Sequence, residues 1–137
     1  MMTRIYADLV ADLFHYGHVE FLKKARALGD YLVVGITADD LVATYKRRPI
    51  LTMGERVASV SGCRFVDKVL PNAPLIIDRA WIEKHDLDLV VHGDDFSQQQ
   101  IEYFYGVPLT MGIFRTVRYT PGISTSEIIR RINAQNT

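Results

Sequence analysis

Residues 29–36 read GDYLVVGI, and this stretch determines the fold class. The Gly-Asp pair ends a preceding helical pattern, and the six residues after it form a continuous, β-branched apolar run. An apolar run of this length without polar alternation is typical of a strand covered on both faces, as in a parallel sheet. A second strong strand is predicted at 87–92, which reads LDLVVH.

Helical and strand patterns alternate on either side of this stretch. Further strands are predicted at residues 5–10, 66–70 and 109–114, and helices at 19–28, near 39, and at 54–61, 78–85, 98–105 and from 124 onward. This alternation predicts a single α/β domain over residues 1–137, with a mostly parallel sheet and helices on both faces. Ligands of such sheets bind beyond the carboxyl ends of the strands.

The composition narrows the class of partner. Sixteen basic residues balance sixteen acidic ones, which argues against a broad nucleic-acid or anionic-membrane footprint. The single cysteine, Cys63, excludes an internal disulfide, fits a reducing compartment and is expected to be a buried structural thiol. The N-terminus lacks a signal-peptide pattern, and no apolar run is long enough to span a membrane. We therefore expect a soluble, cytoplasmic protein without nucleic-acid or membrane partners.

Two histidines follow the first strand. His15 and His18 stand three residues apart where the first helix is expected to begin, so both side chains lie on one side of it. Gly17 leaves room for a ligand to approach the backbone. Free amides at a helix start favour an anion, and two imidazoles there suit the phosphates of a nucleotide. As a bare pattern, the pair could equally be ordinary polar residues; a zinc site is disfavoured because further ligands at useful spacing are lacking.

A second candidate anion site precedes the last helix. Residues 120–126 read TPGISTS, and Ser124 stands three residues before Glu127, the spacing of a capping box. Ser124 is thus expected to cap the helix, which is compatible with phosphate binding by Gly122, Ser124 and Thr125.

Together these segments make the chain resemble the HxGH cytidylyltransferases. HYGH at 15–18 and ISTS at 123–126 carry the resemblance, which continues through YAD at 6–8, DLFH at 12–15, GDYLVVG at 29–35, ER at 55–56, RFVD at 64–67, NAP at 72–74 and HGDD at 92–95. The resemblance implies a Rossmann-like, cytidylyltransferase-like nucleotide-binding domain. It also implies an enzyme that transfers CMP from CTP to a small phosphorylated alcohol, such as phosphoethanolamine or a polyol phosphate, and releases pyrophosphate.

The resemblance also implies roles for individual residues. His15, His18 and Lys46 are expected to be catalytic, the histidines at the α-phosphate and the lysine from a mobile segment. The nucleotide-binding residues it implies are Asp12, Gly17, Asp94, Gly122, Ser124 and Thr125. Phosphoryl-type transfer needs mainly positioning and charge neutralisation, so magnesium is expected to accompany CTP. A homodimer with contacts near residues 64–67 is expected by the same resemblance.

Several positions depart from the family pattern. Leu9, Val10 and Ala11 replace a glycine and an aromatic, so Leu9 either obstructs the nucleotide or points into the core. Tyr119 replaces an arginine, and the nearest one, Arg118, is displaced by one position. These departures keep open a nucleotide-binding module with weak or no catalysis. An adenylyltransferase of the same superfamily, which shares the paired histidines, also stays open.

The acceptor also stays open. Leu75 stands where choline-type enzymes have an aromatic residue, and Trp81 is expected in the core, so choline is not favoured. His92 and Tyr105 are expected to line a polar acceptor pocket.

Overall fold

The computed structural model describes residues 1–136 and contains one five-stranded parallel sheet with strand order β3-β2-β1-β4-β5. In chain order the elements are β1 (Arg4–Leu9), α1 (Tyr16–Arg26), β2 (Tyr31–Thr37), α2 (Asp39–Val42), α3 (Met53–Ser61), β3 (Lys68–Ala73), α4 (Arg79–Lys84), β4 (Leu89–Gly93), α5 (Gln98–Thr110), β5 (Phe114–Val117) and α6 (Thr125–Gln135). The predicted α/β fold, with a mostly parallel sheet, is confirmed.

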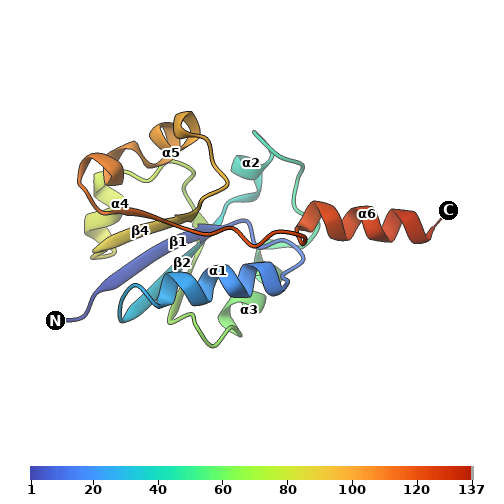
Figure 1. The fold of residues 1–137 in the computed structure, drawn as a ribbon, viewed down its shortest axis with the longest axis horizontal. Helices are drawn as coiled ribbons and strands as arrows, with labels where there is room; N and C mark the ends of the chain where they lie inside the picture. Colours follow the sequence, from blue (N-terminus) through green and yellow to red (C-terminus); the bar gives the residue numbers. More distant parts are fainter. Residues whose placement is uncertain (137) are drawn as a thin grey trace.

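Helices cover both faces of the sheet (Figure 1). Alternate residues of β1 point to opposite faces, as the period of a strand requires. Ile5 and Ala7 join a buried cluster with Leu22 of α1 and Val60 of α3. Tyr6 joins the other cluster, whose members include Ile82 of α4 and Tyr105 of α5. The central strands are therefore apolar on both sides, which explains the unbroken apolar run of β2.

Gly35 in β2 makes room for one large side chain. A Cβ atom at this position would lie 2.1 Å from the Tyr6 hydroxyl oxygen and 2.8 Å from the Cβ of Ala73. The neighbouring strand β1 pairs with β2 in register from Arg4 opposite Tyr31 to Leu9 opposite Ile36. Tyr6 therefore lies flat across the sheet only because position 35 has no side chain.

One predicted strand is wrong. Residues 109–114 were expected to form the last strand, but α5 continues to Thr110 and β5 begins at Phe114. A short apolar run does not distinguish a strand from a buried helical segment. The helix breaks at Tyr105, where φ is −125° and ψ is 22°, and Pro108 lies in the first turn after the break. Proline is tolerated there because that turn lacks amide partners in any case.

The other elements appear where they were expected, with shifted ends. The first helix begins at Tyr16 rather than residue 19, because His15 caps it. The strand predicted at 66–70 is β3, Lys68–Ala73, and the one predicted at 87–92 is β4, Leu89–Gly93. Cys63 is half-buried against the first cluster, and Trp81 packs against the second, with its ring 6.0 Å from that of Tyr6.

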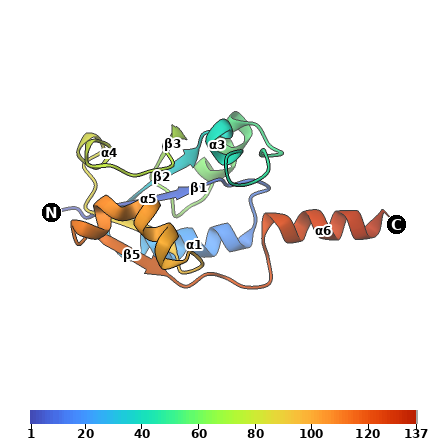
Figure 2. The ribbon, with the colours of Figure 1, turned by 90° about the horizontal axis from the view of Figure 1, so that it is seen from above.

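The last helix projects away from the body of the molecule in both ribbon views (Figures 1 and 2). Its base lies beside the carboxyl ends of the strands, the edge at which parallel sheets bind ligands. Within residues 1–136, no helix is both long enough and apolar enough to cross a membrane.

Candidate active site

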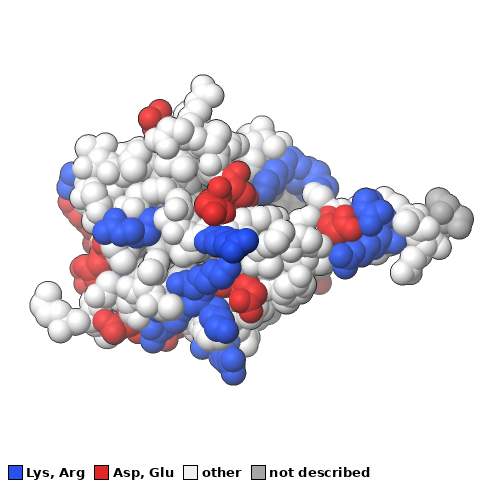
Figure 3. Space-filling view, in the orientation of Figure 1, with Lys and Arg blue, Asp and Glu red and all other residues white. Residues whose placement is uncertain are grey.

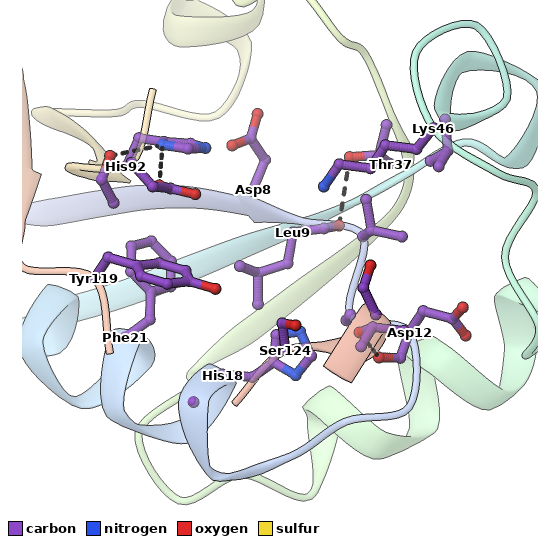
Figure 4. Close-up of a pocket in the computed structure, with 18 of the residues that line it drawn as sticks. Asp8, Leu9, Asp12, His18, Phe21, Thr37, Lys46, His92, Tyr119 and Ser124 are labelled. Carbon is purple, nitrogen blue, oxygen red and sulfur yellow. Dashed lines mark hydrogen bonds and ion pairs between the residues drawn. The ribbon is translucent and has the colours of Figure 1, made fainter. Parts of the chain in front are cut away.

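A cavity of about 350 Å³ opens at the carboxyl ends of the strands. Most of its lining comes from four segments: the end of β1 with the start of α1, the loop after α2, the loop after β4, and residues 119–126 before and at the start of α6. The end of β2, the loop after β3 and α5 also contribute residues. Figure 4 shows side chains from these segments converging on one space. His15, Gly17, His18, Lys46, Ser124, Thr125 and Asp12 all line it, as do His92 and Tyr105.

The two histidines hold each other in a capping arrangement. The amide N–H of Gly17 donates to Nδ1 of His15, and the amide N–H of His15 donates to Nδ1 of His18, both at 3.1 Å. Because a backbone amide can only donate, Nδ1 of each ring accepts, and a neutral ring then carries its proton on Nε2. The ring centroids lie 3.9 Å apart. The backbone thus fixes the tautomer of two imidazoles whose Nε2–H groups remain for a ligand.

Burial favours the neutral form of both rings. Burial lowers the pKa of His18 to about 3, with smaller effects from His15 and Lys46, and burial also lowers the pKa of His15. Gly17 keeps this turn compact, since a Cβ atom there would lie 2.9 Å from Cε1 of His15 and 3.0 Å from a side-chain carbon of Ile123. Neutral imidazoles are good hydrogen-bond donors, and an incoming phosphate would favour their protonation.

The start of α6 is tied to the turn after β1. Ser124 caps α6, with its Oγ accepting from the amide of Glu127 at 3.0 Å. The hydroxyl of Thr125 donates to the backbone oxygen of Asp12 at 2.6 Å. These contacts bring the first amides of α6, and the positive end of its dipole, next to the histidine pair. The cavity therefore has two helix N-termini, those of α1 and α6.

Asp12 anchors the loop that carries Lys46. Its two carboxylate oxygens accept from the amides of Ile50 and Leu51, each at 2.9 Å, and the side chain is almost fully buried. Asp12 therefore contacts the cavity while its oxygens are occupied by the loop, which makes it a positioning residue in this structure. Lys46 is exposed at the rim, and Figure 3 shows Lys and Arg side chains gathered over the loop after α2, near the base of α6.

The opposite wall of the cavity carries a carboxylate among aromatic rings. The hydroxyl of Tyr105 donates to Oδ1 of Asp8 at 2.5 Å. His92 stacks on Phe96 with ring centroids 4.0 Å apart and lies 5.3 Å from the ring of Tyr105. In Figure 4, Asp8 points toward His92, and Leu9 leaves the strand on the other side. Withdrawal from water raises the pKa of Asp8, while His92 and the Tyr105 hydrogen bond oppose this increase.

Two predicted site residues do not line the cavity. Oδ1 of Asp94 accepts from the amide of Tyr119 at 2.8 Å, while its neighbours Gly93 and Asp95 do line the cavity. Gly122 adopts a left-handed conformation, with φ of 85°, in the turn before α6. Both residues shape segments that reach the cavity, and their predicted nucleotide contacts remain predictions.

The departures from the family pattern lie in the cavity wall. Leu9, Tyr119 and Leu75 all line it, and Leu9 also packs against the first core cluster. Ala11 is fully buried and has a φ of 58°, so the turn after β1 is locally strained and has no space for an aromatic side chain.

The sequence reasoning missed residues that assemble only in three dimensions. Asp8, Tyr45, Arg47 and Phe96 line the cavity but were assigned no role. A carboxylate at the end of an apolar strand was a signal for Asp8, whereas Arg47 lies in a basic stretch with Lys46 and Arg48 and nothing in the sequence distinguished it from Arg48. Residues 1–136 contain no cluster of three or more His, Cys, Asp or Glu side chains able to hold a metal ion.

Comparisons with known proteins agree with this geometry. A family model described as cytidylyltransferase-like matches residues 10–131. The chain is 46% identical over 139 residues to ethanolamine-phosphate cytidylyltransferase of Arabidopsis thaliana, covering 96% of this chain and 33% of that protein. It is 38% identical over 133 residues to choline-phosphate cytidylyltransferase A of Homo sapiens, covering 95% of this chain and 36% of that protein. The chain therefore spans about a third of the length of these curated relatives.

A solved structure shares the architecture. The lipopolysaccharide core biosynthesis protein from Thermoplasma volcanium GSS1 superposes with a TM-score of 0.69 at 26% identity, covering 90% of this chain and 100% of that one.

Proposed function

Since this chain belongs to the cytidylyltransferase-like family, we propose that it transfers CMP from CTP to phosphoethanolamine or a similar small phosphorylated alcohol. The observation that carries the proposal is the histidine pair, with Nδ1 of each ring held by a backbone amide and Nε2–H left for a ligand. A pair of fixed donors beside two helix N-termini suits a phosphate on which negative charge builds up.

In the proposed reaction, a phosphate oxygen of the acceptor attacks the α-phosphorus of CTP. A new P–O bond forms, the bond from the α-phosphorus to the bridging oxygen breaks, and pyrophosphate leaves. His15 and His18 stabilise the α-phosphate, Lys46 neutralises charge from the rim, and the first amides of α6 at Ser124 and Thr125 hold the remaining phosphates. Positioning and charge neutralisation suffice for this chemistry, so it requires no protein nucleophile.

Magnesium enters the proposal as part of the substrate. The described residues contain no ready-made cluster of ligands, and both oxygens of Asp12 are already occupied by amides. Triphosphate oxygens are the hard ligands that Mg²⁺ prefers. The metal would therefore arrive with CTP and supply charge neutralisation on the phosphates.

For the acceptor, the cavity favours a primary ammonium group. Asp8 is a carboxylate with a raised pKa and no basic side chain bonded to it among residues 1–136, so a cationic ligand would relieve its desolvation. An ethanolamine ammonium has N–H groups to donate to this carboxylate. A quaternary ammonium has no N–H group to donate to Asp8, so it would gain only contacts with the aromatic rings around this carboxylate. Phosphoethanolamine is thus preferred over phosphocholine and over uncharged polyol phosphates.

We also propose a cytoplasmic homodimer that pairs through the surface around residues 64–67. Arg64 is exposed with its guanidinium 4.9 Å from the ring centroid of Phe65, and Asp67 forms a 3.1 Å ion pair with Arg26. Sedimentation analysis of the wild type and of Phe65→Glu tests this pairing. A wild type that sediments as a monomer at micromolar concentration would contradict it.

The test of function is pyrophosphate release with CTP or ATP and a panel of acceptors: phosphoethanolamine, phosphocholine and glycerol 3-phosphate. We expect turnover with CTP and phosphoethanolamine and an at least tenfold lower kcat/KM with each of the other acceptors. Preference for ATP would instead indicate an adenylyltransferase. Tight CTP binding without turnover on any acceptor would indicate a binding module, to which Leu9 in the cavity wall would be relevant.

A further inference from the structure

The cavity is short of positive charge for its proposed substrate. Three carboxylates line it, those of Asp8, Asp12 and Asp95, and burial favours the neutral form of the two histidines at the helix start. Among the lining residues that the structure describes, only Lys46 and Arg47 have basic side chains other than the histidines, and partial desolvation lowers the pKa of the Lys46 ammonium. Arg118, the arginine nearest in sequence to residue 119, is not among them; its backbone oxygen accepts from Nζ of Lys24 at 3.0 Å.

Arg47 reaches from its loop to the start of α6. Its Nη1 donates to Oγ of Ser126 at 3.3 Å, across 79 residues of sequence. Ser126 lies in the first turn of α6, directly after Ser124 and Thr125. The guanidinium therefore lies beside the amides of the helix N-terminus that the proposed function assigns to the phosphates. Arg48, the next residue in the loop, is exposed and does not line the cavity.

A guanidinium in this place has two properties that the neighbouring lysine lacks. It stays charged at every physiological pH, and its planar fork can bind two phosphate oxygens at once. The helix amides offer only partial charges to the same phosphates. The guanidinium and the helix amides, which lie side by side, are therefore two sources of positive potential for one ligand.

We propose, on the premise of the proposed function, that Arg47 binds the β- and γ-phosphates of CTP and, through Ser126, holds its loop against α6. Arg47 is then a substrate-binding residue that recognises the triphosphate and stabilises the pyrophosphate leaving group. It has no part in recognising the base, the ribose or the acceptor. Its contribution to binding requires the β- and γ-phosphates, so its loss should weaken the binding of CTP but not that of CMP.

The experiment measures dissociation constants of CTP and CMP, with Mg²⁺ and without acceptor, by calorimetry. The proteins are the wild type, Arg47→Ala, Arg47→Lys and the matched control Arg48→Ala, with thermal melting to verify folding. We expect Arg47→Ala to weaken CTP binding roughly 10- to 100-fold, as for loss of a charge-assisted contact, and to change CMP binding less than about twofold. The CTP affinity of Arg47→Lys should lie between those of the wild type and Arg47→Ala, and the CTP affinity of Arg48→Ala should match that of the wild type.

Each outcome has one meaning. A wild type that binds CTP, with Arg47→Ala and Arg48→Ala equal to it, overturns the role of Arg47 and leaves the proposed function standing. Equal losses of CTP and CMP affinity in Arg47→Ala also overturn it, because the residue would then act only on the shape of the loop. A wild type that binds neither nucleotide refutes the proposed function itself. Ser126→Ala is expected to weaken CTP binding in the same direction by a smaller factor.

Discussion

Replacing the buried Arg56 with methionine is expected to lower the free energy of unfolding by about 3–5 kcal/mol. Arg56 lies on α3 and is fully buried. Its Nη1 donates to the backbone oxygens of Val10 at 2.8 Å and Thr37 at 3.1 Å, and its Nη2 pairs with Asp39. One guanidinium thus joins the ends of β1 and β2 to the start of α2.

The magnitude follows from what the substitution leaves behind. Methionine fills similar space, so the main loss is of donors and not of volume. Two backbone oxygens lose their donor, a buried one at Thr37 and a part-buried one at Val10, and each unsatisfied buried acceptor costs about 1–3 kcal/mol. The Asp39 side chain is 36% exposed, so water can solvate its freed carboxylate, and that loss adds about 1 kcal/mol or less. Since the free energy of unfolding of small domains is about 5–15 kcal/mol, the variant should be only marginally stable.

Urea unfolding followed by circular dichroism measures the effect. The matched control is Arg79→Met, an exposed arginine at the start of α4, which should change stability by less than about 0.5 kcal/mol. If Arg56→Met fails to fold, Arg56→Lys keeps one charged donor and should show a smaller, measurable loss. A loss under about 1 kcal/mol in Arg56→Met would refute the reasoning, because the carbonyl oxygens would then have found other donors.

Three further predictions concern the cavity. His15→Ala or His18→Ala should lower turnover roughly 10²- to 10⁴-fold and, because each removes part of the cap of α1, should lower the melting temperature by a few degrees at pH 7.5. Normal turnover in a folded variant would remove the mechanism. Burial holds the pKa of His18 at about 3 in the folded protein, against about 6.5 when unfolded, so the contribution of His18 to stability is complete above pH 6.5 and falls by about 2 kcal/mol by pH 5. Urea unfolding at several pH values should therefore show a steeper loss of unfolding free energy with falling pH in the wild type than in His18→Asn. Parallel curves for the two proteins would contradict this prediction. Leu9→Gly, made without changing the enclosed Ala11, should tighten CTP binding about tenfold, or about 1.4 kcal/mol, as measured by calorimetry. Unchanged affinity in a folded variant would mean that the native cavity wall already admits the nucleotide.

Local pattern was sufficient for the elements whose character is set by neighbouring residues. The apolar run of β2 and the histidine cap of α1 both follow from short-range rules of burial and of amide satisfaction. Local pattern was not sufficient at residues 109–114, where a strand was predicted and a helix end was found. The apolar side chains there pack equally well from a helix or a strand, and only the sheet, which already paired β4 with Phe114–Val117, decided between them.

The fold class, the family resemblance and the two helix starts that frame the cavity were predictable from the sequence, because each is carried by short motifs that can be recognised one at a time along the chain. The tertiary structure alone decided which distant groups meet there. Asp8 accepts from Tyr105 across 97 residues, and Arg47 reaches Ser126 across 79. Contacts of this kind depend on how the crossovers of the parallel sheet return the chain to one edge. A hydrogen bond is made by position and orientation in space, and no local pattern encodes them for residues so far apart.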